Sequence, residues 1–161
     1  MVFAKTPEVA AKLSDMQQDG EIAKYYQAVI TGELPDFEGE MVDYLLRDGK
    51  TNTTKVVKKG EKDAKRAELY YEVLDVMDTD DGTLSYVLIE LVTGRHHQIR
   101  VQMAYFGHPL IGDRKYGKEI TDHMNSVQSS TKRFQAGQLH LCAYKLTFHH
   151  PKTGKEMEFQ I

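Results

Sequence analysis

Two runs rich in tyrosine and β-branched residues, at 69–77 and 84–92, constrain the fold of this chain most. They are separated by the string D-T-D-D-G-T at 78–83, which has the composition of a hairpin turn. The second run carries apolar residues on both of its faces, as a strand does when it lies in the middle of a sheet. We therefore expect a sheet built around this hairpin, with 84–92 as a central strand.

Two helices are expected to flank the sheet. The first has Thr6 as its N-cap and Pro7 at its first position, and it ends near Gly20. Its apolar stripe comprises Val9, Leu13 and Met16. The second helix is expected to start directly after the strand 84–92 and to end at Gly107. Its helically spaced apolar residues are Ile99, Met103 and Phe106.

Further strands are expected on the N-terminal side. Residues 22–31 alternate with period two, which points Tyr26 inward and Tyr25 outward. Residues 41–46 form a short strand candidate after a loop that contains proline and glycine. The first residues, M-V-F-A-K-T-P, have the pattern of a strand already in progress, so we expect a segment before it.

The C-terminal residues predict a closing hairpin. Residues 139–148 alternate and shift phase near Ala143, as a β-bulge would, and the chain then returns through 151–154 to a strand at 157–161. Strands with only a few helices favour an α+β fold with a mixed, largely antiparallel sheet. Because 161 residues suit one ordinary core, we expect a single domain over 1–161.

Composition limits the classes of function. The net charge of −3 weighs against nucleic-acid binding unless basic residues cluster locally. The lone Cys142 cannot form an internal disulfide or contribute to a zinc site made of cysteine pairs, so a cytoplasmic location is the default. No run approaches the ~18 apolar residues that a membrane span needs, so no membrane partner is expected.

Basic residues do cluster in one block, 93–116, against the single carboxylate of Asp113. The cluster consists of Arg95, Arg100, Arg114 and Lys115, joined by His96, His97 and His108. At a strand-to-helix junction, exposed backbone N–H groups would add to the attraction for an anion such as phosphate. The alternative is a surface helix with solvated arginines. A metal site is not expected, because adjacent histidines on a helix point about 100° apart and no further ligand completes a set.

A second lysine-rich stretch, 48–68, has two interpretations. Its basic residues are Lys50, Lys55, Lys58, Lys59, Lys62, Lys65 and Arg66, and they alternate with four carboxylates. A solvated, mobile hairpin is the favoured interpretation, and an arm that contacts phosphates is the other.

The string T-G-R-H-H-Q-I-R-V at 93–101, followed by G-H-P-L-I-G-D-R-K-Y-G at 107–117, resembles the signature of RluA-type RNA pseudouridine synthases. K-Y-Y at 24–26 resembles the K-x-Y element of this family, and L-H-L-C-A-Y-K-L-T-F-H-H-P at 139–151 resembles its closing motif. The resemblance extends over most of the chain and includes the opening strand. The polar segments 48–68 and 118–138 carry little of it.

The resemblance implies isomerisation of uridine to pseudouridine in rRNA or tRNA, on a flipped-out base, by an attacking aspartate and without cofactor or metal. It implies that Tyr26 packs against the target base, although a core tyrosine with a satisfied hydroxyl is the alternative. It also implies that Arg100 pairs with the catalytic aspartate. RNA-facing positions are expected to be Arg95, His97, Gln98, Arg114 and Lys115.

One departure from the family pattern concerns the aspartate itself. The family carries it in an H-R-L-D-x-x-x-S/T-G-like loop before the strand that starts here at Met1, and these 161 residues contain no such loop. Asp113 matches a different element, the G-D-x-x-Y-G turn. We therefore expect an N-terminally truncated domain in which Arg100 lacks its carboxylate partner, the catalytic aspartate. We expect this domain to be inactive alone and to self-associate through an exposed sheet edge. The alternative is a non-catalytic remnant that binds RNA or a partner.

Overall fold

The computed structural model describes residues 2–80, 82–119 and 138–161. Its helices and strands occur in the order α1 (Pro7–Gln18), β1 (Ala23–Thr31), β2 (Glu38–Asp48), β3 (Thr53–Val57), β4 (Lys65–Thr79), β5 (Gly82–Leu91), α2 (Gln98–Tyr105), β6 (Leu141–His149) and β7 (Glu156–Gln160). Neither described helix is long and apolar enough to cross a membrane.

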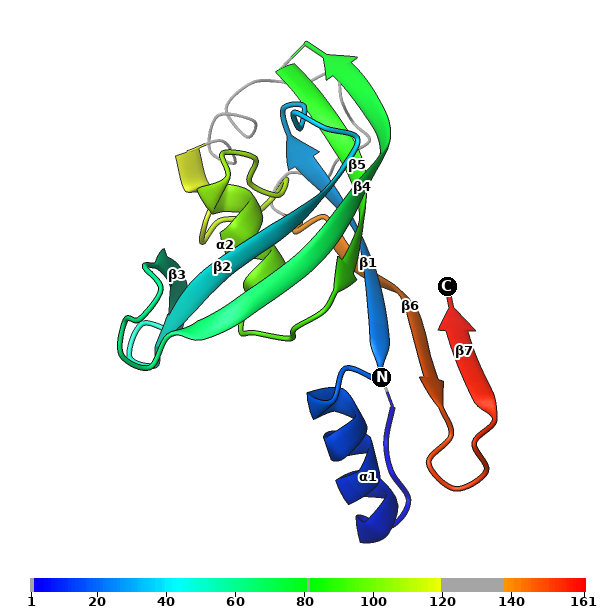
Figure 1. The fold of residues 1–161 in the computed structure, drawn as a ribbon. Helices are drawn as coiled ribbons and strands as arrows, with labels where there is room; N and C mark the ends of the chain where they lie inside the picture. Colours follow the sequence, from blue (N-terminus) through cyan, green and yellow to red (C-terminus); the bar gives the residue numbers. More distant parts are fainter. Residues whose placement is uncertain (1, 81, 120–137) are drawn as a thin grey trace.

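The strands form one seven-stranded sheet in the order β3-β2-β4-β5-β1-β6-β7, and each neighbouring pair is antiparallel (Figure 1). The α+β class and the antiparallel sheet are confirmed. The β4–β5 hairpin turns where the D-T-D-D-G-T string predicted it, and β5 is the middle strand. The outer strands are β3 and β7, so the expected self-association would involve one of these edges.

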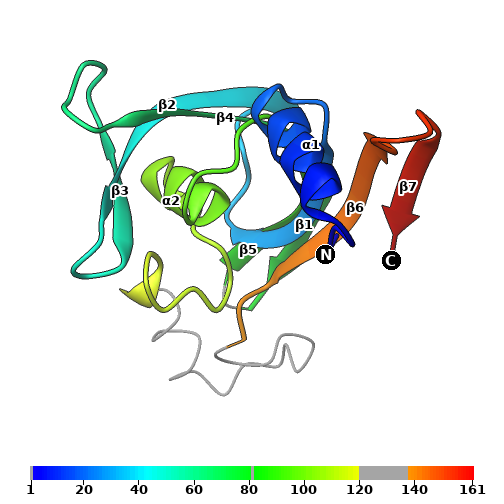
Figure 2. The ribbon, with the colours of Figure 1, turned by 90° about the horizontal axis from the view of Figure 1, so that it is seen from below.

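The curved sheet holds α2 on its inner side (Figure 2). The helix buries Ile99 and Met103 there, as their spacing of four residues predicted. They pack in the main core cluster with strand residues that include Ala28, Ile30, Leu69, Val87 and Ile89. Burial of each such large aliphatic side chain contributes roughly 1.5–3 kcal/mol, so this contact fixes α2 against the sheet.

The first helix forms as predicted but lies at the periphery. The Thr6 hydroxyl accepts a hydrogen bond from the Val9 N–H at 3.4 Å, and Pro7 occupies the first helical position. None of its residues is fully buried, and Figure 1 shows α1 beside the start of β1, away from α2. The strand predicted at the N-terminus is wrong, because residues 2–4 form no strand and Phe3 is 79% exposed.

The alternation predicted for β1 and the bulge predicted near Ala143 are both confirmed. Ala28 and Ile30 are buried in the main core, and Tyr26 packs against it on the same face. The pairing of β1 with β6 shifts register between Tyr25 and Tyr26, which face Lys145 and Ala143 respectively. The β6–β7 hairpin follows, so the closing hairpin has the predicted topology.

Candidate functional site

The connection between β5 and α2, residues 92–97, forms the first part of the candidate site. We expected the helix to start directly after the strand; instead this segment lies between them. Its last residue, His97, occupies the N-cap position of α2 with a left-handed backbone (φ 53°, ψ 25°) and makes no side-chain cap. Because residues other than glycine seldom adopt this backbone conformation, the surrounding contacts must hold the turn in place.

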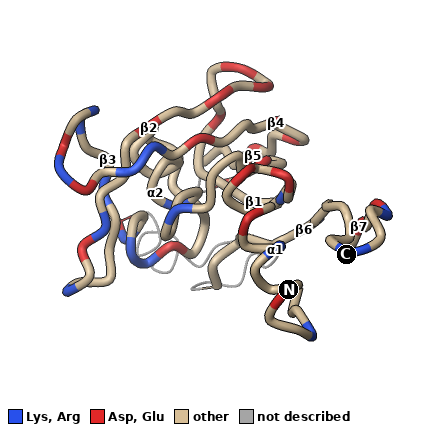
Figure 3. Tube along the Cα trace, turned by 60° about the horizontal axis from the view of Figure 1, so that its bottom comes forward, with Lys and Arg blue, Asp and Glu red and all other residues tan. Residues whose placement is uncertain are grey.

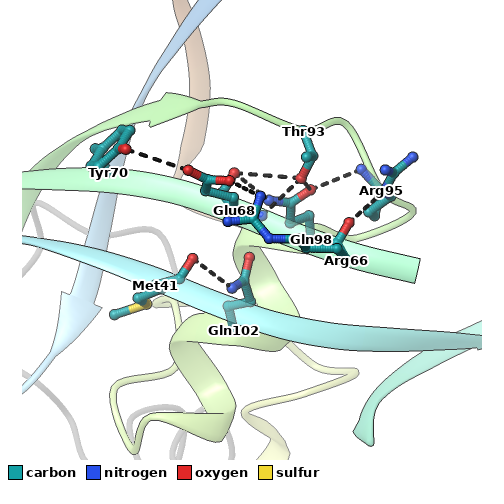
Figure 4. Close-up of polar contacts among 8 residues, drawn as sticks. All are labelled: Met41, Arg66, Glu68, Tyr70, Thr93, Arg95, Gln98 and Gln102. Atoms are coloured by element: carbon teal, nitrogen blue, oxygen red, sulfur yellow. Dashed lines mark hydrogen bonds and ion pairs between the residues drawn. The ribbon is translucent and has the colours of Figure 1, made fainter. Parts of the chain in front are cut away.

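Gln98 lies at the centre of the contacts that hold this connection (Figure 4). Its Oε1 accepts hydrogen bonds from the Thr93 hydroxyl at 2.8 Å and from the Arg95 backbone N–H at 2.9 Å. Its Nε2 donates to the carbonyl of Glu68 on β4 at 3.0 Å. Gln98 is only 2% exposed. Its predicted RNA-facing role therefore needs correction, since the side chain is buried and committed to internal hydrogen bonds.

Arg95 is exposed, and β4 restrains its side chain. Its Nε donates to the Arg66 carbonyl at 2.8 Å. The Arg66 side chain forms an ion pair with Glu68, whose own side chain is 11% exposed, and Tyr70 donates a hydrogen bond to the same carboxylate. Arg66 therefore neutralises a nearly buried carboxylate, which would otherwise be costly. Figure 4 shows these β4 residues next to the Thr93–Gln98 contacts.

Arg100 holds Asp113 through two hydrogen bonds. Its Nε donates to Oδ2 at 2.8 Å and its Nη2 to Oδ1 at 2.6 Å. The Asp113 side chain is fully buried and the Arg100 side chain is 17% exposed. The backbone N–H groups of Lys115 and Tyr116 also donate to Oδ1, at 2.9 and 3.0 Å. Arg100 thus has a carboxylate partner in Asp113, a contact that the sequence did not predict.

The pKa of Asp113 follows from this balance. Burial opposes ionisation of the carboxyl group, but the hydrogen bonds from Arg100 and from the backbone outweigh it and lower the pKa. The Asp113 hydrogen bond in turn raises the pKa of Arg100. Asp113 therefore carries its negative charge at neutral pH, and that charge is directed at Arg100 and two backbone amides.

Tyr116 joins α2 to the β2–β3 hairpin. Its hydroxyl accepts a hydrogen bond from the Thr54 N–H at 2.9 Å and bonds to His97 Nδ1, also at 2.9 Å. The Arg100 guanidinium lies 5.1 Å from the centroid of the Tyr116 ring, within range of a cation–π contact. A second hydrogen bond, at 2.9 Å, joins Thr54 to His96 Nδ1. Tyr116 therefore links the connection before α2 to strand β3.

Both histidines of the site have lowered pKa values. For His97, burial and the nearby charge of Arg100 lower the pKa to about 4. For His96, burial followed by the charges of Arg47 and Lys115 lowers the pKa. His97 is consequently neutral at physiological pH, so it can offer a ligand a hydrogen bond but no positive charge.

The lysine-rich stretch is ordered where it meets the site. Its first part becomes β3, which pairs with β2, and its last part begins β4. Lys115 Nζ donates to the Asn52 carbonyl at 2.9 Å, in addition to the contacts of Thr54. Residues 53–57 are therefore a strand of the sheet, while Lys58, Lys59 and Lys62 are exposed, as the solvated interpretation expects.

Basic residues lie around the β2–β3 hairpin. Arg114 and Lys115 are exposed on the loop after α2, and Figure 3 shows many Lys and Arg positions on the β3 side of the molecule. Many Asp and Glu positions lie around β1, β4 and β5 instead. The local basic cluster expected from the sequence is thus a surface made by two separate segments of the chain.

Tyr26 lies apart from this surface. It packs against the main core and lines a groove of ≈ 930 Å³ with residues of α1, β6 and β7, among them Leu13, Leu146 and Phe159. Among the described residues, its hydroxyl has no hydrogen-bond partner and it makes no polar contact with Arg100. Tyr26 is therefore a partly exposed residue with its ring packed against the core and its hydroxyl not engaged by any described residue.

Sequence reasoning missed several residues of the site. Glu68 was counted among solvated charges but is buried, and nothing in the sequence marked Thr54. Thr93 and Tyr116 lie in the motif strings, but no contact or function was predicted for them. Within the part of the chain that the structure describes, no three His, Cys, Asp or Glu side chains lie together as metal ligands would.

Comparison with known proteins gives consistent matches. A family model described as RNA pseudouridylate synthase matches residues 1–105. The ribosomal large subunit pseudouridine synthase D of Zymomonas mobilis is 35% identical over 159 residues, which cover 99% of this chain and 47% of that protein. The tRNA pseudouridine synthase C of Vibrio cholerae is 29% identical over 164 residues, or 98% of this chain and 64% of that protein.

Two solved human structures share the fold. Human RNA Pseudouridylate Synthase Domain Containing 1 superposes with a TM-score of 0.73 at 22% identity, covering 98% of this chain and 61% of that one. Domain Containing 4 superposes with a TM-score of 0.72 at 19% identity, covering all of this chain and 65% of that one. The chain spans about half the length of the first curated relatives it matches.

Proposed function

The chain belongs to the RNA pseudouridylate synthase family, of the RluA type, and from this premise we propose that its site serves the isomerisation of uridine to pseudouridine in structured rRNA or tRNA. The observation that carries the proposal is the family match over residues 1–105. The names of the curated relatives, a ribosomal and a tRNA enzyme, support both RNA classes. The exposed lone cysteine is compatible with a cytoplasmic location.

In the proposed reaction Tyr26 packs against the target base. Its position in the groove between α1, β6 and β7 and a hydroxyl that no described residue engages support this role, because a flat ring can stack on a base while the hydroxyl handles a proton. Arg95, Arg114 and Lys115 contact the RNA backbone, and neutral His97 offers a hydrogen bond. These contacts give electrostatic affinity without specifying sequence.

Arg100 has a restricted part in this scheme. Two of its nitrogens are committed to Asp113, and Nη1 donates to no acceptor among the described residues. Nη1 is the group that can pair with a further carboxylate, such as the attacking aspartate of the family. Asp113 does not replace that aspartate, because its carboxylate is fully buried and engaged by Arg100 and two backbone amides.

These 161 residues alone are accordingly proposed to be inactive. Two measurements test the proposal separately. A pseudouridine map of cellular rRNA and tRNA, with and without the gene, should lose at least one modified site, and an unchanged map contradicts the family function. Pseudouridine formation by the purified 161-residue chain on the same RNAs would contradict the inactivity alone.

The second candidate function is RNA binding without catalysis. The observation that favours it is the engagement of Asp113 by Arg100, which leaves the described site without an accessible carboxylate at this arginine. RNA binding by the purified chain, together with an unchanged pseudouridine map on removal of the gene, would select this function.

A further inference from the structure

Arg95 is held by two hydrogen bonds, one from its backbone and one from its side chain. Its backbone N–H donates to Gln98 Oε1 at 2.9 Å, and its Nε donates to the Arg66 carbonyl at 2.8 Å. Its Nη1 and Nη2 have no acceptor among the described residues, and the residue is exposed. The end of the guanidinium is therefore presented outward from a restrained position.

The restraint depends on a connected set of buried and part-buried hydrogen bonds. Thr93 and Glu68 are joined twice through the backbone, since the Glu68 N–H donates to the Thr93 hydroxyl at 2.8 Å and the Thr93 N–H donates to the Glu68 carbonyl at 3.1 Å. Gln98 connects to both residues and to Arg95. Figure 4 shows its amide between β4 and the connection that carries Arg95.

We propose that Gln98 is the positioning residue of a phosphodiester contact made by Arg95. The buried Gln98 amide ties the backbone of Arg95 to β4, so the guanidinium meets an RNA phosphate in a single orientation. The inference rests on the proposed function for the identity of the anion. Gln98 therefore does not make the direct RNA contact that the sequence had led us to expect, but affects binding by positioning Arg95.

The remaining donors match this ligand. Two terminal guanidinium nitrogens in one plane bind two oxygens of a phosphate side by side, a geometry that a lysine cannot offer. A side chain that is already restrained loses less conformational entropy when it binds, so its contact is tighter than that of a free surface arginine. Arg114 provides the contrast, because it is exposed and no restraining hydrogen bond is found for it among the described residues.

The same helix offers a matched control. Gln102 lies one turn after Gln98, is completely buried, and donates through Nε2 to the Met41 carbonyl at 3.3 Å and to Asp43 at 2.8 Å. It holds α2 to β2 and makes no contact with Arg95. Replacing either glutamine by methionine removes a buried amide of similar size, but only one of the two should affect the phosphate contact.

The experiment measures binding of a fluorescein-labelled RNA stem-loop to the 161-residue chain over a range of salt concentrations, together with thermal unfolding. The variants are Arg95→Gln, Gln98→Met, the double variant, Thr93→Val, Thr93→Ser and the control Gln102→Met. Arg95→Gln should weaken binding about tenfold and reduce the slope of log affinity against log salt by about 0.7–0.9. Gln98→Met should weaken it roughly 3–10-fold with a similar change of slope.

Coupling between the residues separates positioning from a general structural role. In the Arg95→Gln background, Gln98→Met should cause no further loss of affinity, because the residue through which it acts is gone. Thr93→Val should resemble Gln98→Met, and Thr93→Ser should restore binding. Gln102→Met should lower the unfolding temperature and leave the salt slope unchanged.

Other outcomes overturn the inference. An additive loss in the double variant, an unchanged slope in Gln98→Met, or no RNA binding by the unmodified chain each contradicts it. The proposed function fails independently: RNA binding that depends on Gln98 through Arg95, combined with an unchanged pseudouridine map when the gene is removed, contradicts the isomerase function and leaves the inference standing.

Discussion

The guanidinium of Arg100 and the buried carboxylate of Asp113 are joined by two hydrogen bonds, of 2.8 and 2.6 Å. The pair connects α2 to the loop that follows it, and Tyr116 at the end of this loop reaches β3. The arginine therefore serves the structure of the site through Nε–H and one Nη2–H, and its Nη1 group and the second Nη2–H are left for any role toward RNA. We make five predictions, beginning with this pair.

Asp113→Asn should destabilise the chain by about 3 kcal/mol, because it leaves a largely buried arginine without its counter-charge. Urea unfolding at neutral pH measures the change. Glu158→Gln is the control, since the Lys145–Glu158 ion pair is exposed and should contribute within about 1 kcal/mol. Equal effects of the two substitutions would show that the burial of Asp113 does not matter.

The lowered pKa of Asp113 also predicts sensitivity to acid. Because the folded-state pKa lies below that of the unfolded chain, the stabilisation is complete above the unfolded value of about 4 and is lost as the pH falls through the folded value. Unfolding curves of the unmodified chain and of Asp113→Asn should therefore converge at low pH. A difference that stays constant below pH ~3 would contradict this.

His97 should titrate with a pKa of about 4, well below the ordinary histidine value, as burial and the charge of Arg100 disfavour its cationic form. The unfolded chain binds the proton more readily than the folded chain between about pH 4 and pH 6.5, so stability should rise with pH across this window. Histidine NMR signals followed against pH provide the measurement. A His97 midpoint near the ordinary histidine value would exclude the predicted shift.

Tyr116→Phe should loosen the β2–β3 hairpin from the site. The buried Thr54 N–H would lose its acceptor, at a cost of about 1–3 kcal/mol. Hydrogen exchange at the Thr54 amide should accelerate, and the midpoint of unfolding should fall. Tyr70→Phe removes a hydroxyl from a residue that is 44% exposed and should have a smaller effect. An unchanged exchange rate at Thr54 would mean that β3 is held by its pairing with β2 alone.

The exposed lysines of the hairpin decide between its two interpretations. These lysines lie on the segment between β3 and β4 and are exposed, so we expect the triple variant Lys58→Gln, Lys59→Gln and Lys62→Gln to weaken RNA binding and reduce its salt slope by about 1–2. The control is Lys152→Gln with Lys155→Gln, on the β6–β7 turn. An unchanged slope in the triple variant would select the solvated interpretation.

Local patterns in the sequence determined most of the fold. Alternation, turn composition and helix caps depend on neighbours within a few residues, so they predicted the β4–β5 hairpin, α1, the bulge near Ala143 and the inward face of Tyr26. The motif strings likewise indicated the family. These signals are present in the chain before it folds.

Only the tertiary structure decided which side chains meet. Gln98 and Arg95 belong to the same motif, and each donates a hydrogen bond to a carbonyl group of β4. Gln98 is buried and holds the connection in place, whereas Arg95 is exposed. Thr54 reaches Tyr116 across 62 positions of sequence. Arg100 found its partner in Asp113 through the turn of the following loop. Such pairings depend on where the sheet and α2 place distant segments, which no local pattern records.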